Sequence, residues 1–108
     1  MLIITKLPLM KKLKNVHPGE VIREEFMEPM GLTAYRVAKD LHVSQTRLGE
    51  VLNGKRSVTP EMALRLATWS GATPQFWLNL QKAFDLEEAL RSPVAKKIAL
   101  EVNPLVYS

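Results

Sequence analysis

The sequence predicts an all-α fold, with five helices and a short C-terminal extension. Apolar residues recur at helical spacing in successive short runs between Pro18 and Phe84. Four of these runs follow a serine or threonine, and glycine comes after three runs, as at helix starts and ends. The expected caps are Thr33, Ser44, Thr59 and Thr73, and the expected stops are Gly31, Gly54 and Gly71. A chain of 108 residues, 46% of them apolar, suits one domain around one core.

Charge and cysteine content narrow the class of protein. The net charge of +4 is mild, but relative to length the excess of basic over acidic residues is larger in the middle of the chain than over the chain as a whole. Between residues 36 and 56, two acidic residues stand against five basic ones: Arg36, Lys39, Arg47, Lys55 and Arg56. The chain contains no cysteine, which excludes a disulfide framework and a thiolate zinc site. We expect a cytoplasmic protein without cofactor or metal.

Residues 1–15 are expected to form a flexible N-terminal segment. The apolar opening is interrupted by Lys6 and Pro8, so it is too short to span a membrane. Its lysines follow the apolar run, whereas a signal peptide carries its basic residues first. We expect a solvated tail, with a basic arm on phosphate as the alternative, and Met10 is an alternative start to Met1.

The first helix is expected to begin at Pro18 and to end at Pro29 and Gly31. Ile22, Phe26 and Met30 lie four residues apart and are expected to form an inward stripe. His17 stands beside the helix start. Capping or exposure is expected there rather than metal binding, because no second ligand has suitable spacing.

Residues 34–53 have the pattern of a helix-turn-helix. Three apolar residues fit one face of each short helix, and Val43 lies between the helices where it can plug the turn. The apolar faces are Val37, Ala38 and Leu41, then Leu48, Val51 and Leu52. His42 occupies the turn position where this motif usually carries glycine. A left-handed backbone at that residue costs about 1 kcal/mol.

The second helix of this pair is expected to read DNA, because its polar residues gather at the end that usually meets base edges. The expected base contacts are Gln45, Thr46, Arg47 and Glu50. The expected phosphate contacts are Thr33, Arg36, Ser44, Lys55 and Arg56. Spacing alone leaves open a plain helical hairpin inside another all-α protein.

Two helices are expected after this motif, each opened by Thr-Pro. Met62, Leu66 and Trp69, with Ala63 and Ala67, form the buried face of the first. In the second helix, an aromatic stripe is formed by Phe76, Trp77, Leu80 and Phe84. The stripe is core or is shared with a dimer mate, and the pattern does not show which of its residues stay in their own core. Residues 85–92 fit one more short helix. The tail, residues 92–108, fits a strand, a helix with a loose end or a segment that orders on a partner.

Several stretches together resemble the HigA/VapI-type antitoxins of the lambda-repressor-like (XRE) helix-turn-helix family. They are HPGEVIREEF, the helix-turn-helix, NGKRSVTPEMALRLA and TPQFWLNLQ, and the resemblance covers about Val16 to Glu88. It implies a DNA-binding domain over residues 16–91 that dimerises and represses its own operon at a palindromic operator. It also implies neutralisation of a HigB-like toxin, a small RNA-cleaving enzyme of the RelE type.

Other functions fit the sequence less well. The main alternative is a stand-alone helix-turn-helix regulator without a toxin. An enzyme is not expected, because the adjacent acids at 24–25 and 87–88 project in different directions and no nucleophile has a base beside it. RNA binding is disfavoured, since the aromatic residues lie on core stripes.

The resemblance leaves the toxin contacts open. A basic toxin favours acidic surface or a segment that blocks its site. The acidic candidates are Glu24, Glu25 and Glu28 on the first helix and Asp85, Glu87 and Glu88 near the end of the domain. The other candidate is the apolar tail, whose residues equally fit packing across a homodimer.

Overall fold

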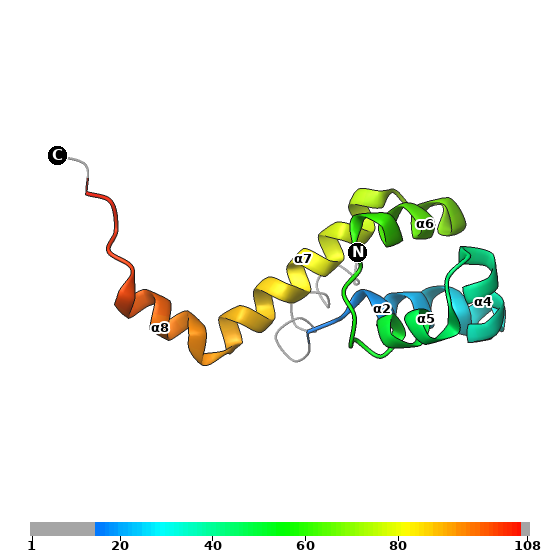
Figure 1. Ribbon diagram of the computed structural model, residues 1–108, viewed down its shortest axis with the longest axis horizontal. Coiled ribbons are helices and arrows are strands. Elements are labelled where there is room, and N and C mark those ends of the chain that lie inside the picture. The colour runs from blue at the N-terminus through cyan, green and yellow to red at the C-terminus, as the bar shows by residue number, and fades with distance from the viewer. Residues whose placement is uncertain (1–14, 107–108) are drawn as a thin grey trace, which may run out of the picture.

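The computed structural model describes residues 15–106, and this part of the chain is helical without a strand (Figure 1). The elements are α2 (Pro18–Val21), η1 (Ile22–Met27), α3 (Glu28–Met30), α4 (Ala34–Leu41), α5 (Gln45–Leu52), α6 (Pro60–Ser70), α7 (Pro74–Arg91) and α8 (Pro93–Glu101). The first three follow one another without a gap and act as one helix. The all-α prediction is confirmed. The expectations for residues 1–14 lie outside the described residues.

Short-range side-chain bonds start the helices where the sequence predicts. Thr33, Ser44, Thr59 and Thr73 each accept a hydrogen bond from the backbone N–H three residues on, at 3.0–3.2 Å. All three predicted stop glycines have positive φ. Gly31 and Gly71 directly follow α3 and α6. The boundaries therefore depend on local contacts that sequence spacing reveals.

The first helix differs from the prediction because its centre is a π-helix. In η1 the backbone bonds span five residues, as from the Glu28 N–H to the Arg23 carbonyl. This wider turn carries Met27 into the core, while Met30 is 69% exposed. The prediction that Met30 faces inward was wrong for this reason. Phe26 remains half-buried against the core.

The core forms where α2 and η1, α4, α5, α6 and the first half of α7 meet. α4 packs on α5, α6 packs on α4 and α7, and α2 contacts both α5 and α7. Trp77 is fully buried, and the Phe26 ring lies 5.7 Å from its ring centroid. The apolar faces predicted for the helix-turn-helix are all buried. Trp69 is half-buried at the edge of this core rather than inside it.

Gly19 lets α2 approach α5 closely. A Cβ added at Gly19 would lie 2.1 Å from the Val51 carbonyl oxygen, which belongs to the backbone and cannot move aside. Only glycine fits this crossing.

α7 is longer than the aromatic stripe suggested, because residues 85–91 continue it instead of forming a separate helix. Glycine and proline, the residues that break helices, are absent from that stretch. Ser92 ends α7 and caps α8, its Oγ accepting from the Val94 N–H at 3.3 Å. The tail is therefore a helix with an extended end, one of the three predicted alternatives.

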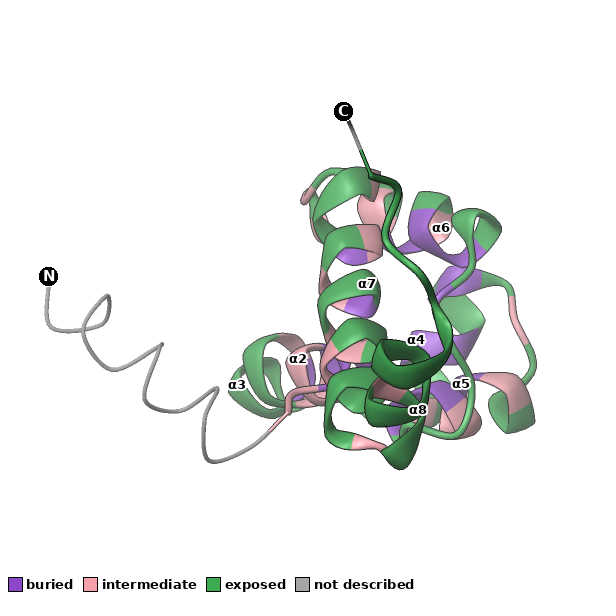
Figure 2. Ribbon diagram, turned by 90° about the vertical axis from the view of Figure 1, so that its left-hand side faces the viewer, coloured by how far each residue is buried: buried purple, intermediate pink, exposed green. Residues whose placement is uncertain are grey.

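The molecule has two unlike regions, here called the body (residues 15–84) and the arm (residues 85–106). The arm runs outward from the body along the axis of α7 and bends at α8, giving extents of 57 × 34 × 25 Å (Figure 1). Figure 2 shows buried residues within the body and an arm that is almost entirely exposed. None of the helices described is long and apolar enough to cross a membrane.

Candidate nucleic-acid interface

The turn between α4 and α5 is closed by His42 in a left-handed conformation, with φ 58° and ψ 45°. The expectation of strained turn chemistry at this residue is therefore confirmed. The His42 N–H donates to the Lys39 carbonyl at 3.2 Å, and the Val43 N–H donates to the Ala38 carbonyl at 3.1 Å. These bonds use carbonyls that a helix end leaves free. They hold α4 and α5 in a fixed relation.

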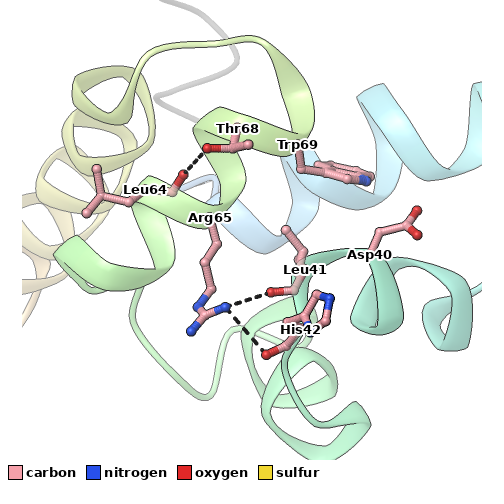
Figure 3. Close-up of a pocket in the computed structure, with 7 residues that line it drawn as sticks. All are labelled: Asp40, Leu41, His42, Leu64, Arg65, Thr68 and Trp69. Atoms are coloured by element: carbon pink, nitrogen blue, oxygen red, sulfur yellow. Dashed lines mark hydrogen bonds between the residues drawn. The ribbon is translucent and has the colours of Figure 1, made fainter.

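Arg65 on α6 reinforces this turn from outside. Its Nη1 donates to the Leu41 carbonyl at 3.0 Å and to the His42 carbonyl at 3.5 Å (Figure 3). The guanidinium also places positive charge at the C-terminal end of α4, where the helix dipole favours it. A surface hollow of about 380 Å³ beside it is lined by Asp40, Leu41, His42, Leu64, Arg65, Thr68 and Trp69.

The N-terminal end of α5 presents free polar groups. Gln45 and Thr46 are exposed in its first turn. The caps Ser44 and Thr33 are exposed as well, and their oxygens accept from backbone N–H groups. Each hydroxyl keeps its own hydrogen, which can donate to a phosphate oxygen. The first turn of α5 and the two caps therefore offer exposed groups that can form hydrogen bonds with DNA.

Arg47 is held more tightly than a solvent-exposed arginine. Its side chain is 25% exposed, and its Nη2 donates to Glu61 Oε1 at 3.1 Å. Glu61 lies in the first turn of α6 and also accepts from Arg65, whose Nε and Nη2 lie 3.1 and 2.8 Å from Oε2. Hydrogen bonds from Arg65 and then Arg47 lower the pKa of Glu61 below its ordinary value. The carboxylate therefore stays ionised between two guanidiniums.

Sequence reasoning did not single out Glu61 or Arg65. Their i,i+4 spacing on one helix is a signal that could have paired them. The link to Arg47 has no such signal, because it joins residues 14 positions apart on different helices.

The loop after α5 carries the next cations. Arg56 donates to Glu50 Oε1 from Nε at 2.8 Å and from Nη2 at 2.6 Å. Glu50, expected to contact bases, thus points back toward the loop in the free protein. Lys55 is exposed and makes no ion pair within residues 15–106. It is accordingly the most available cation of this loop.

Arg36, the remaining predicted phosphate contact, lies exposed on α4. Its Nε donates to Asp40 Oδ2 at 2.9 Å, in an i,i+4 pair. Exposed ion pairs contribute only about 0–1 kcal/mol, so a phosphate can replace the carboxylate at little cost. The same holds for Arg56 and Glu50.

His17 is a buried helix cap. Its Nδ1 accepts from the Gly19 N–H at 2.9 Å, and its ring contacts the Phe84 ring edge-on, with centroids 4.8 Å apart. Burial lowers the pKa of the imidazole, although the carboxylates of Asp85 and Glu20 act in the opposite direction. Of the two expected roles, capping is confirmed. Within residues 15–106 no group of three His, Asp or Glu could hold a metal ion.

The aromatic stripe of α7 mostly packs inside its own chain. Trp77 is fully buried, whereas Leu80 and Phe84 are half-buried against the body. Phe76 is 40% exposed, with its ring edge-on to Trp77. Within this stripe, Trp77 thus belongs to the core and Phe76 to the surface.

Comparison with known proteins assigns the family. A helix-turn-helix family model matches residues 24–68. The virulence-associated protein I of Dichelobacter nodosus is 49% identical over 78 residues, which are 72% of each chain. An addiction module antidote protein of the HigA family from Coxiella burnetii superposes with a TM-score of 0.79 and 44% identity, over 85% of this chain and 99% of that one. The chain belongs to the HigA family of antitoxins.

A further HigA structure was solved on DNA. The Pseudomonas aeruginosa antitoxin HigA with the higBA promoter has a TM-score of 0.80 and 31% identity to this chain, covering 86% of it and all of that protein. HigA proteins are helix-turn-helix DNA-binding regulators and not a class of enzyme. The family, the fold and the DNA-binding class inferred from sequence are thereby confirmed. The roles of individual side chains on DNA remain predictions.

Proposed function

We propose that this HigA-type protein binds a palindromic operator as a dimer, represses its own operon and neutralises a HigB-like, RNA-cleaving toxin. The observation that carries the DNA-binding part is the N-terminal end of α5. There the exposed Gln45 and Thr46 directly follow the Ser44 cap hydroxyl, on a motif whose P. aeruginosa counterpart was solved with the higBA promoter.

In the proposed complex the first turn of α5 enters the major groove. Gln45 pairs with adenine and Arg47 with guanine, each good pair contributing about 1–3 kcal/mol of discrimination. Thr46 contacts a neighbouring base. Glu50 accepts from cytosine once Arg56 leaves it for phosphate. The phosphate contacts are Thr33, Arg36, Ser44, Lys55 and Arg56.

A dimer is needed because one recognition helix reads too few base pairs for a useful specificity ratio. Two copies place their helices about one turn of DNA (~34 Å) apart. The arm offers the surface, since α7 and α8 expose Leu86, Leu90, Val94 and Ile98. Phe76 is the exposed residue of the aromatic stripe and is proposed to add apolar surface, whereas Trp77 is buried in the core.

The toxin is proposed to meet acidic surface and the tail. Glu24, Glu25 and Glu28 are exposed on the first helix and suit a basic protein. The second acidic set, near the end of the domain, already has partners within the chain. Glu87 pairs with Arg91, Asp85 accepts a hydrogen bond from Gln81, and Glu88 accepts one from Asn15. The extended end of the tail exposes Val102, Leu105 and Val106, which fit a segment laid across a partner.

Footprinting of the purified protein on the DNA upstream of its own gene tests the repressor part. A protected inverted repeat is expected. Arg47→Ala should weaken operator binding far more than binding to random DNA. Equal losses on both DNAs would make Arg47 a phosphate contact, and the absence of protection would refute operator binding.

Co-expression with the protein encoded next door, followed by pull-down, tests the antitoxin part. A stable complex that weakens when residues 93–108 are deleted is expected. Equal recovery without these residues would move the contact to the acidic helix. A neighbour that is not toxic alone and does not co-purify would favour the alternative, a stand-alone regulator.

A further inference from the structure

We propose that Glu61, which does not itself need to touch DNA, determines DNA specificity by positioning the Arg47 guanidinium for base recognition. This inference rests on the proposed DNA-binding function and names a residue outside the helix-turn-helix. It begins from one contact, the 3.1 Å bond from Arg47 Nη2 to Glu61 Oε1.

The contact with Glu61 uses only part of the hydrogen-bonding capacity of Arg47. A guanidinium carries five N–H donors in a fixed plane. Glu61 takes one of them, so the other four remain for a guanine edge or a phosphate. A bidentate pair with guanine requires two donors in one plane at a defined orientation. Glu61 can therefore orient the guanidinium plane of Arg47 and still leave two donors for the bidentate pair with guanine.

The Glu61 side chain is 58% exposed, but it is held on both carboxylate oxygens. Two donors of Arg65 hold its other carboxylate oxygen, at 2.8 and 3.1 Å. Arg65 is anchored in turn by the Leu41 carbonyl at the end of α4, at 3.0 Å (Figure 3). The chain of contacts runs from α4 through α6 to the first turn of α5. The Arg47 side chain is thus oriented by the same three helices that form the DNA-binding unit.

The exposure of the arginines agrees with this arrangement. The Arg47 side chain is 25% exposed, against 62% for Arg36, which pairs with Asp40 on the same helix, and 50% for Arg56, which pairs with Glu50 on the preceding helix. A long side chain ordered before binding loses less conformational entropy when it meets a base. The greater exposure of Arg36 and Arg56 suits contacts to phosphate.

The test compares affinities for two DNA duplexes. One is selected by the wild-type protein from a random-sequence duplex library, and the other is a scrambled duplex of the same length and composition. Glu61→Gln preserves the shape of the side chain but removes its charge. The specificity ratio is the affinity for the selected duplex divided by the affinity for the scrambled duplex. For Glu61→Gln this ratio should fall about fivefold, which is part of the discrimination that one bidentate pair supplies. Loss of a negative charge alone should raise affinity for both duplexes and leave the ratio unchanged.

Asp40→Asn is the matched control. It removes the same charge from a 2.9 Å pair with Arg36, which is proposed to hold phosphate. Its specificity ratio should stay at the wild-type value. Thermal unfolding of both variants checks that each is folded at the temperature of the binding assay. If Glu61→Gln unfolds there, Arg65→Lys, which keeps the charge but loses the planar fork, replaces it and should lower the ratio in the same direction.

A double mutant separates positioning from a direct effect. In an Arg47→Ala background, Glu61→Gln should no longer change the ratio, because the residue it positions is gone. An unchanged ratio in the single mutant, or the same fall in both backgrounds, would overturn the inference and leave the proposed function intact. A wild-type protein that does not discriminate between the duplexes would overturn both.

Discussion

The body and the arm of this chain are stabilised in different ways. All the buried apolar side chains of the described chain lie in the body, around Trp77 and the helix-turn-helix. The arm continues the same helix, α7, and then turns into α8, yet none of its residues is buried. Its helices are supported mainly by local bonds, such as the Ser92 cap and the Arg91–Glu87 pair at 3.0 Å.

Such local bonds are weak support for a helix in water. A nine-residue helix such as α8 is shorter than isolated helices need for stability. Its contacts are with α7, and its apolar residues, among them Val94 and Ile98, remain exposed. The body therefore holds the helix-turn-helix in place by its own core, whereas the arm leaves apolar residues exposed, as the proposed dimer requires.

The largest expected effect separates the two regions by stability. Trp77→Ala empties the centre of the body and should lower the free energy of unfolding by about 3–5 kcal/mol. Leu90→Ala, at an arm residue that is 60% exposed, should change it by less than about 0.5 kcal/mol in dilute protein. Urea unfolding followed by circular dichroism measures both. A loss at Leu90 that grows with protein concentration would show that the arm is buried between copies.

A second prediction concerns two glycines of the body. Gly19→Ala places a methyl group 2.1 Å from the Val51 carbonyl oxygen, so α2 must separate from α5. A destabilisation of about 1–3 kcal/mol or more is expected. Gly49→Ala is the matched change on the open side of α5, where an added Cβ meets nothing within 4 Å. It should stabilise the helix by about 0.5–1 kcal/mol. Equal destabilisation at both positions would contradict the tight crossing.

The features predicted correctly from sequence are those set by contacts within a few residues. Thr33 and Thr59 cap helices through bonds that span three residues, so spacing reveals them. Met30 was misplaced because the π-helix at residues 22–27 changes the hydrogen-bond register, and regular helical spacing does not include that change. The Arg47–Glu61 bond was missed because it depends on how α5 and α6 meet, which no local pattern encodes.

The third prediction contrasts the cations of the two regions on DNA. Neutralising Lys55 and Arg56 together should weaken binding almost regardless of sequence and reduce the salt slope by about two units, one per lost phosphate contact. The arm offers a matched pair of adjacent cations, Lys96 and Lys97, both exposed. Neutralising these should leave the slope unchanged. A slope that is unaffected by the Lys55→Ala, Arg56→Ala double mutant would remove the loop from the interface.

The smallest expected effect is a pH dependence that arises in the body, at His17. Because burial lowers the pKa of His17 below 6.5 in the folded chain, the unfolded chain binds the extra proton first as pH falls. The stability that the neutral imidazole contributes is complete above pH 6.5 and is lost as the pH drops toward the folded pKa. Protonation also fills Nδ1, the atom that accepts the Gly19 N–H, so the cap of α2 is lost with it.

Thermal unfolding at pH 7.5 and pH 5.5 measures this dependence. The midpoint temperature of wild-type unfolding should be lower at pH 5.5 than at pH 7.5. The decrease should be smaller for His17→Asn, because asparagine can still cap the helix but does not titrate. His42→Asn is the matched control, because it removes an exposed histidine while asparagine tolerates the left-handed turn. It should keep the wild-type pH dependence. If His17→Asn retains the full fall, the loss of stability comes from other groups of the body, and His17 is a cap without a role in the pH response.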